Sequence, residues 1–186
     1  MRILLTGISC VGKTTVGKIL AERLQYHFFD LDDEIEKYFG ESIERLKARY
    51  RMEHDFRYEI GVIVFKDILF KRDSSDCVIA MPPSGLKDAY LRTIRKIDCI
   101  VVAINDTPEN ILKRIIFCDI DSKPFEKHLT EENKRYYLKE IKKDISYFGK
   151  SYHRAHLRVD IAGLSIEESV SRIQLAIQED NSGNVQ

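Results

Sequence analysis

The chain has 186 residues, 44% of them hydrophobic and 32% charged, which is enough apolar sequence to bury one core. Thirty Lys and Arg balance thirty Asp and Glu, so no overall charge recruits nucleic acid or an anionic membrane, and neither partner is expected. No run approaches the roughly 18 apolar residues of a membrane span, and the first residues lack a secretory signal pattern, so a cytoplasmic location is expected.

The first 24 residues predict a strand, a glycine-bounded loop and a helix. Met1–Thr6 is a short apolar run, and Thr14–Leu24 has apolar side chains at helical spacing. The loop between them, GISCVGKTT, matches the pattern G-x-x-x-x-G-K-[ST]. This spacing, in this strand–loop–helix context, predicts a phosphate-binding loop for a nucleoside triphosphate, most simply ATP.

The residue types in the loop suit a phosphate site. The glycines let successive backbone N–H groups point at phosphate oxygens, at the positive end of the helix. Lys13 would neutralise charge on the β- and γ-phosphates, and the hydroxyl of Thr14 would bind Mg²⁺. Thr15 either donates to a phosphate or packs the first helical turn. The predicted nucleotide-binding residues of the loop are Gly7, Cys10, Val11, Gly12, Lys13, Thr14 and Thr15.

The four cysteines have no CxxC or Cys/His spacing typical of zinc sites. Cys77, Cys99 and Cys118 stand in or beside apolar runs and are predicted to be small core residues. Cys10 differs because it lies inside the glycine loop, where converging amides favour a thiolate. Sensitivity of Cys10 to oxidation is therefore one interpretation of this position.

Two acids follow the second predicted strand, His27–Asp32. Asp30 and Asp32 both reach the ligand edge of a sheet if the strand ends between them. One would hold Mg²⁺ through water, and the other would accept a proton or hydrogen bond from a substrate hydroxyl. The alternative is that Asp32 or Asp33 only caps the next helix, which Gly40 ends.

The rest of the chain alternates strand and helix patterns. Short apolar runs predict further strands at Cys77–Met81, Cys99–Ile104 and His156–Ile161. Helices are predicted after Ser42, over Met52–Phe70 and Leu86–Lys96, after Thr107, from Thr130 past Lys143, and after the Ser165/Glu168 capping box. A turn is predicted at Ser74–Asp76, and Phe117–Leu129, which has no clear period, predicts a mobile loop.

Five apolar strands separated by helices predict an α/β fold. Its parallel sheet is covered by helices on both faces, with ligands at the carboxyl ends of the strands. A single domain is predicted over residues 1–180, followed by a frayed tail at 181–186.

The segment Phe29–Val64 resembles the shikimate kinase family. The family has Asp-x-Asp, Ile-Glu, Gly, Ser-Ile and later Glu-x-x-Phe-Arg-x-x-Glu after its phosphate loop. Here the matching residues are Asp30, Asp32, Ile35, Glu36, Gly40, Ser42, Ile43, Glu53, Phe56, Arg57 and the nearby Glu59. The resemblance implies a P-loop kinase, a three-layer sandwich with strand order 2-3-1-4-5, a substrate-binding helical region at about 32–72 and a lid at about 117–129. A monomer is expected.

The resemblance also implies roles for single residues. Asp32 would approach the substrate hydroxyl, Asp30 would join Thr14 at the metal by orienting its water, and Arg57 would hold the substrate carboxylate. Arg114 would stand over the adenine ring, which cation–π attraction favours. Lys123, followed by Pro124 where the family has Arg-Pro, would be the catalytic lid cation.

Two stretches depart from the family pattern. The family has three consecutive glycines after its third strand, whereas this chain has MPPSG, in which Pro82 and Pro83 lack N–H donors and would reshape the substrate wall. A second carboxylate-binding arginine of the family falls near Phe148, with Lys150 and Arg154 close by. Lys150 and Arg154 are therefore both candidates for the second carboxylate-binding cation.

The sequence thus predicts an enzyme that moves the γ-phosphoryl group of MgATP to a hydroxyl of a small polar metabolite, with shikimate as the leading acceptor. One alternative is a kinase for another hydroxy acid, such as gluconate, or for a nucleoside monophosphate. Another is an ATP-binding regulator without turnover, which the altered glycines and lid arginine would suit.

Overall fold

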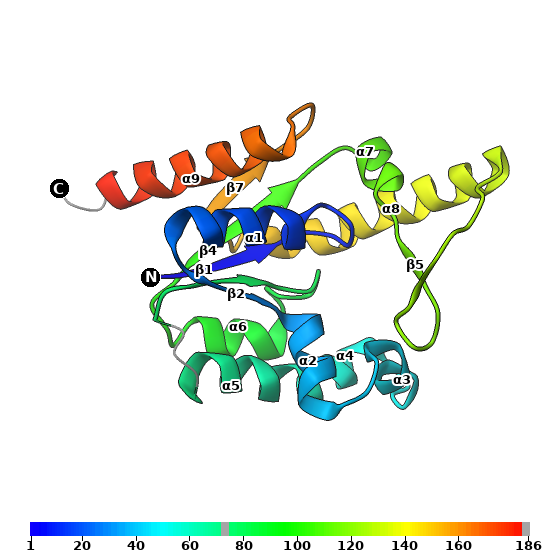
Figure 1. Cartoon of the computed structure of the whole chain (residues 1–186), viewed down its shortest axis with the longest axis horizontal. Helices are drawn as coiled ribbons and strands as arrows, with labels where there is room; N and C mark the ends of the chain where they lie inside the picture. The colour runs from blue at the N-terminus through cyan, green and yellow to red at the C-terminus, as the bar shows by residue number, and fades with distance from the viewer. Residues whose placement is uncertain (72–74, 184–186) are drawn as a thin grey trace.

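The computed structural model describes residues 1–71 and 75–183. Its main sheet has five parallel strands in the order β2-β3-β1-β4-β7, so the predicted order 2-3-1-4-5 is confirmed. Figure 1 shows the carboxyl ends of these strands pointing toward the side of the molecule that carries β5, away from the N-terminus. The strands are β1 Arg2–Thr6, β2 His27–Asp30, β3 Cys77–Ala80, β4 Ile100–Asn105 and β7 Leu157–Asp160.

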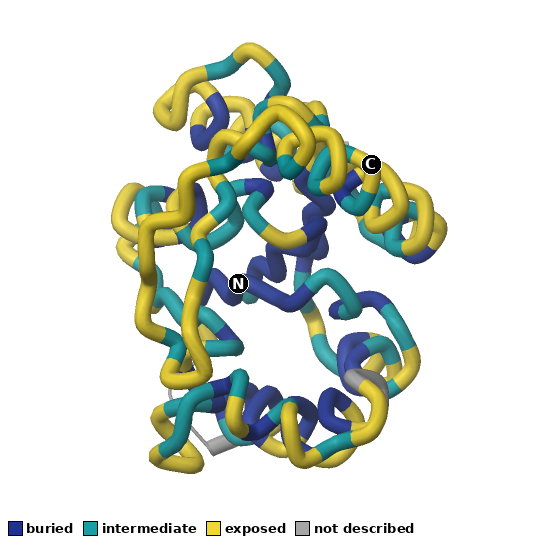
Figure 2. Tube along the Cα trace, turned by 90° about the vertical axis from the view of Figure 1, so that its right-hand side faces the viewer, coloured by how far each residue is buried: buried dark blue, intermediate teal, exposed yellow. Residues whose placement is uncertain are grey.

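The three central strands are buried on both faces, as continuous apolar runs predict. Leu4 of β1, for example, pairs with Ile79 of β3 and Val101 of β4, and none of the three is more than 1% exposed. Figure 2 shows burial concentrated along these strands and on the inner turns of the helices.

Helices cover the sheet on both sides. In Figure 1, α1 and α9 lie in front of the strands while α8 passes behind them. Helix α1 packs on β3 and on α9, and α5 packs on α6. The helices are α1 Lys13–Leu24, α2 Leu31–Phe39, α3 Ile43–Ala48, α4 Glu53–Phe56, α5 Val62–Lys71, α6 Asp88–Ile94, α7 Pro108–Lys113, α8 Glu131–Tyr152 and α9 Ile166–Gly183, with a π-helical segment η1 Arg57–Gly61.

Side-chain caps explain several helix starts. Ser42, Thr107 and Thr130 each accept a hydrogen bond from the backbone N–H three residues later, as predicted. The predicted capping box also forms, because Glu168 accepts from Ser165 N–H at 2.8 Å while its own N–H donates back to Ser165. Helix α2 begins at Leu31 because Asp30 ends β2 and caps the helix, so the alternative that Asp32 or Asp33 is the cap is wrong.

The predicted long helix over residues 52–70 is one helical stretch with a π segment inside it. Gly61, at the end of η1, lies against Tyr90 of α6, and a Cβ added to Gly61 would stand 2.0 Å from the Tyr90 hydroxyl. The absence of a side chain there lets the two segments approach closely. Such π segments are rare and are often found at functional sites.

Three expectations are corrected. Residues 117–129 are not wholly irregular, because β5 (Phe117–Cys118) pairs antiparallel with β6 (Pro124–Phe125). Cys118 on this hairpin is exposed, whereas Cys77 is buried and Cys99 half-buried. The tail is not frayed at 181–183, because α9 continues to Gly183. Residues 184–186, Ser74 of the predicted turn and residue 72 of the predicted substrate region lie outside the described residues.

Within the described ranges, no helix combines the length and apolar character needed to cross a bilayer.

Candidate active site

The loop between β1 and α1 has the backbone of a phosphate cradle. Gly7 and Gly12 have φ of +150° and +108°, which L side chains rarely adopt. A Cβ on Gly7 would stand 2.6 Å from the carbonyl oxygen of Ile104, so the loop packs tightly on the end of β4. Cys10 also has a positive φ, 59°, and is half-buried within the loop. The loop leads directly into the N-terminus of α1, where an anion is favoured.

Lys13 lies over this loop. Its Nζ donates hydrogen bonds to the carbonyl oxygens of Gly7 and Ile8, both at 2.9 Å. Loss of hydration lowers the pKa of Lys13 to about 8, and the opposing charges of Asp32 and Asp30 limit the fall. The ammonium group is therefore held at the mouth of the loop, where an added anion would raise its pKa again.

Thr14 and Asp30 meet as the sequence predicted. Thr14 Oγ1 donates to Asp30 Oδ2 at 2.6 Å, while Asp30 Oδ1 accepts from the backbone N–H of Asp32 at 3.1 Å. Burial raises the pKa of Asp30, although the Thr14 hydroxyl opposes the shift. A hydroxyl beside a carboxylate suits Mg²⁺, a hard cation that keeps several waters and binds few protein groups. In the described part of the chain, no group of three or more His, Cys, Asp and Glu side chains could hold a metal.

Asp32 and Arg57 form an ion pair between α2 and η1. Arg57 is 5% exposed, its Nη1 pairs with Asp32 Oδ1, and its Nη2 lies 3.4 Å from Oδ2. Burial alone would raise the pKa of Asp32, but the charge and hydrogen bonds of Arg57 outweigh it and hold the pKa below its usual value. Asp32 is thus a carboxylate at neutral pH, and its side chain is 37% exposed.

A cavity of about 200 Å³ opens beside Arg57 of this pair. Its lining includes Arg57, Tyr58, Ser84, Lys87, Tyr147 and Phe148. Ser84, rather than either proline of MPPSG, is the part of that segment that borders the cavity. Pro83 instead contributes its carbonyl oxygen to Tyr152 at 3.2 Å, and Pro82 is buried. Their predicted role in the substrate wall stays a prediction.

Arg114 is fixed across the phosphate loop. Its Nη1 donates to the carbonyl oxygen of Val11 at 3.2 Å, its Nη2 pairs with Asp106, and its Nε donates to Asn110 O at 3.1 Å. Burial lowers the pKa of Arg114, and an arginine side chain keeps its positive charge in proteins. The guanidinium therefore stands where a nucleotide bound to the loop would meet it.

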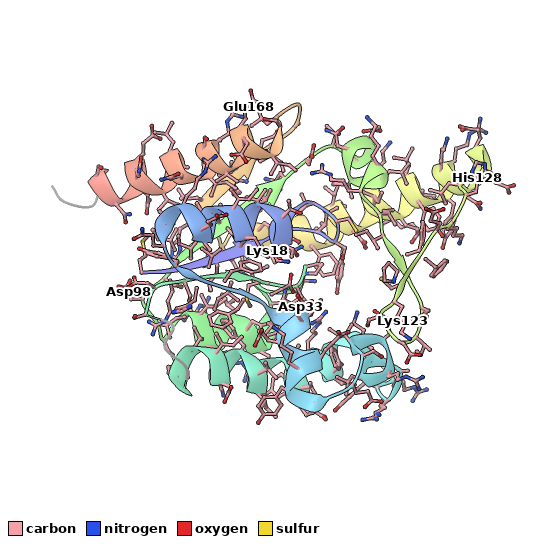
Figure 3. All side chains as sticks on the ribbon, viewed as in Figure 1. Lys18, Asp33, Asp98, Lys123, His128 and Glu168 are labelled. Atoms are coloured by element: carbon pink, nitrogen blue, oxygen red, sulfur yellow. The ribbon has the colours of Figure 1, made fainter. Side chains whose placement is uncertain are left out.

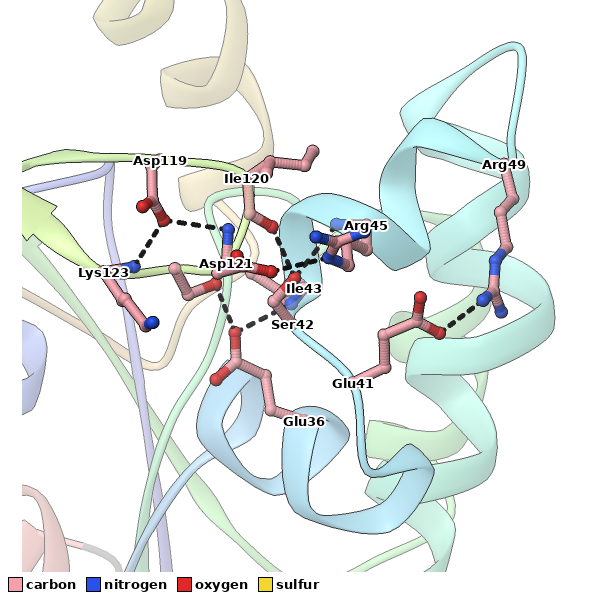
Figure 4. Close-up of polar contacts among 11 residues, drawn as sticks. Glu36, Glu41, Ser42, Ile43, Arg45, Arg49, Asp119, Ile120, Asp121 and Lys123 are labelled. Carbon is pink, nitrogen blue, oxygen red and sulfur yellow. Dashed lines mark hydrogen bonds and ion pairs between the residues drawn. The ribbon is translucent and has the colours of Figure 1, made fainter.

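The segment of residues 117–129, called the lid below, contacts the α2–α3 region (Figure 4). Ser122 Oγ donates to Glu36 Oε1 at 2.6 Å, and Ser42 Oγ donates to Ile120 O at 2.6 Å. Arg45 Nε pairs with Asp121 Oδ1 at 2.6 Å, between exposed side chains. These contacts join the tip of the lid to α2, which carries Asp32, and to the start of α3.

Lys123 is exposed and lies in the part of the lid near α2 and α3, whereas His128 lies at the other end beside α8 (Figure 3). The backbone N–H of Lys123 donates to Asp119 Oδ1 at 2.9 Å, which shapes the turn.

Comparisons with known proteins agree with this geometry. The family model for shikimate kinase matches residues 9–178. The chain belongs to the shikimate kinase family. It is 30% identical to a shikimate kinase of Chlorobium limicola over 95% of this chain and 83% of the relative, and 31% identical to one of Persephonella marina over 92% and 95%. The crystal structure of shikimate kinase from Aquifex aeolicus, 28% identical, superimposes with a TM-score of 0.70 over 97% of this chain and 98% of that one.

Membership of the shikimate kinase family makes this chain a P-loop small-molecule kinase, and the fold and recognition predicted from sequence are confirmed. The individual site residues remain proposals. The structure brings together Lys13, Thr14, Asp30, Asp32 and Arg57, and places Arg114 on the loop. It does not bring Lys150 or Arg154 to the cavity lining. Arg154 donates to Leu86 O at 2.9 Å, and Lys150 lines a separate groove along α8.

Sequence reasoning missed two groups of residues. Ser42 and Glu36 were recognised as family matches but not as partners of the lid, and Asp121 and Ser122 carry no sequence signal of that role. Lys87 was also missed, because a lysine near a helix start usually indicates a solvated charge.

Proposed function

We propose that this chain transfers the γ-phosphoryl group of MgATP to a hydroxyl of shikimate. One observation carries the proposal: two aspartates two residues apart join the two halves of the site. Asp30 is bonded to Thr14 of the phosphate loop, and Asp32 is paired with Arg57 at the cavity. A donor bound on the loop and an acceptor bound in the cavity would therefore meet at the start of α2.

Nucleotide binding fits the residues present. The tight loop around Gly7 has no room for a Cβ, its lysine is already at the mouth, and α1 presents its N-terminus. Thr14 and Asp30 would hold Mg²⁺, which neutralises charge on the β- and γ-phosphates when bound. Val11, Gly12 and Thr15 complete the loop, and Arg114 would lie against the adenine.

Asp32 would orient the acceptor hydroxyl and accept its proton. Its low pKa makes it a weak base, which suits a loose transition state in which the hydroxyl loses its proton late. Arg57 would hold the acceptor carboxylate through its planar fork, and Pro82 and Pro83 would shape the neighbouring wall. Lys13 and, from the lid, Lys123 would neutralise the charge spread over the transferring group.

The test is acceptor-dependent ADP release, measured with shikimate, gluconate and a nucleoside monophosphate for the parent and for Arg57→Lys. We expect turnover with shikimate, and a KM for shikimate raised about 30-fold in the variant because a point charge cannot replace the two-pronged contact, a loss of about 2 kcal/mol. The KM for ATP should barely change.

Equal KM values for shikimate in both proteins would remove Arg57 from the acceptor site. MgATP binding without turnover of any acceptor would contradict the proposed activity and favour the regulator alternative.

A further inference from the structure

We propose that Lys87 supplies the second cation for the acceptor carboxylate, opposite Arg57, and that the site thereby selects small hydroxy acids with one negative charge. This inference rests on the proposed kinase function and assigns its acceptor site more closely.

The ammonium group of Lys87 is held at the cavity by two aromatic rings of α8. Its Nζ lies 3.4 Å from the centre of the Tyr147 ring and 4.9 Å from that of Phe148. Both rings line the cavity that Arg57 also lines. Cation–π contacts position an ammonium group without neutralising it. Within the described chain, no carboxylate lies in ion-pair range of Lys87, so its charge is available to an anion.

Ser84 adds a polar group to the same wall. Its Oγ is buried, makes no hydrogen bond in the part of the chain that the structure describes, and belongs to the cavity lining. An unsatisfied buried hydroxyl is rare and costs free energy, so an occupant with an acceptor oxygen is favoured there. Once the Ser84 side chain turns its hydroxyl into the cavity, a carboxylate between Arg57 and Lys87 would provide that oxygen.

The other candidates for the second cation are occupied or distant. Arg154 donates to Leu86 O, and Lys150 lines a neighbouring groove of α8 that shares Tyr147 with the cavity but does not line the cavity itself. Phe148 contributes a ring to the lysine instead of a charge. The second cation therefore comes from the segment after β3 and not from α8.

Size and charge limit the acceptor. A volume of about 200 Å³ is below the roughly 300–1,000 Å³ of pockets for drug-sized ligands, which favours an acceptor smaller than a nucleoside monophosphate. Asp88 is an exposed carboxylate on the lining and disfavours a second negative charge. The cavity thus suits one carboxylate on a compact hydroxylated skeleton, such as the ring of shikimate.

The experiment compares steady-state kinetics of the parent, Lys87→Gln, Lys87→Arg and, as a matched control on α8, Lys150→Gln. With shikimate, Lys87→Gln should raise KM about 10- to 100-fold, the effect of one lost charge-assisted hydrogen bond, with the KM for ATP unchanged. Lys87→Arg should recover most of the loss, and Lys150→Gln should behave as the parent.

A neutral acceptor separates recognition from packing. With shikimate methyl ester, the parent and Lys87→Gln should have the same KM, whereas a purely structural role for Lys87 would raise KM for both acceptors alike. If Lys87→Gln does not fold, Ser84→Ala is measured instead and should raise KM for shikimate about 3- to 10-fold.

Calorimetric titration with shikimate keeps this inference distinct from the proposed function. If the parent binds shikimate without phosphorylating it, the kinase proposal fails, and weaker binding by Lys87→Gln still supports the cation pair. Equal affinity in both proteins, no binding to the parent, or a KM defect confined to Lys150→Gln would overturn it.

Discussion

Replacing Ser122 with alanine tests whether the lid must rest on α2 for phosphoryl transfer. The change removes the 2.6 Å hydrogen bond from Ser122 Oγ to Glu36 Oε1. Glu36 keeps its other bond, from the backbone N–H of Ile43 at 2.7 Å, so α3 is not disturbed. Ser122 has φ of 57°, and alanine is similarly strained there, so the backbone cost is nearly matched.

The magnitude follows from the charge on Glu36. A hydrogen bond to a charged group contributes about 1.5–3 kcal/mol, which half-burial reduces to about 1–2 kcal/mol. The ratio of contacting to open lid should therefore fall about 5- to 30-fold.

Two measurements follow this ratio. Hydrogen exchange of the amides in residues 117–129 should become faster in Ser122→Ala, and the KM for MgATP should rise, with Ser182→Ala on α9 as the control. Faster lid exchange with unchanged kinetics would show that lid contact is not needed for transfer. Unchanged exchange would refute the assigned strength of the contact itself.

Three further changes test the site. Lys13→Ala should abolish transfer without unfolding the protein. In the parent, the lowered Lys13 pKa of about 8 would return toward 10.5 when phosphate binds, so the affinity for MgATP should fall about tenfold from pH 7 to 9. An affinity that does not change with pH would contradict the lowered pKa of Lys13. Asp32→Asn should lower turnover by about a hundredfold while MgATP still binds, and normal turnover with lost ATP affinity would move Asp32 to the metal site. Gly61→Ala should cost about 1–3 kcal/mol by forcing apart η1 and Tyr90, seen as a lower Tm that Tyr90→Phe partly restores; an unchanged Tm would mean that the contact relaxes freely.

The free folded protein is expected to gain stability from Lys13 as pH rises between about 8 and 10.5. The lowered pKa means that the unfolded chain binds a proton in this window that the folded chain does not. Denaturant titrations of the parent and Lys13→Ala across this range measure the difference in their free energies of unfolding. Relative to Lys13→Ala, the parent should be least stable below about pH 8, where the difference is constant, and should gain stability up to about pH 10.5.

The features that depend on neighbouring residues, such as the phosphate loop and the strands, could be predicted from local sequence patterns. The phosphate loop followed from glycine and lysine spacing within eight residues, and the strands from unbroken apolar runs that both faces of a parallel sheet require. The order of the strands came from the family resemblance and not from periodicity, which says nothing of neighbours in space.

Contacts between distant segments could not be predicted. Glu36 and Ser122 are 86 positions apart, and neither has a pattern that points to the other. The π segment at Arg57–Gly61 keeps the apolar stripe of an ordinary helix, so the sequence pattern does not distinguish the two. Lys87 belongs to the candidate site because the fold places Tyr147 of α8 against its ammonium group.

The most direct measurement of the central claim is MgATP-dependent phosphorylation of shikimate, followed by ADP release and by the phosphorylated product, for the parent beside Asp32→Asn. Stoichiometric ADP and phosphoshikimate from the parent, with a rate about a hundredfold lower in the variant, is the expected result. ADP release that does not depend on shikimate, or that is equal in the two proteins, would contradict the assignment of donor and acceptor to the two sides of Asp30 and Asp32.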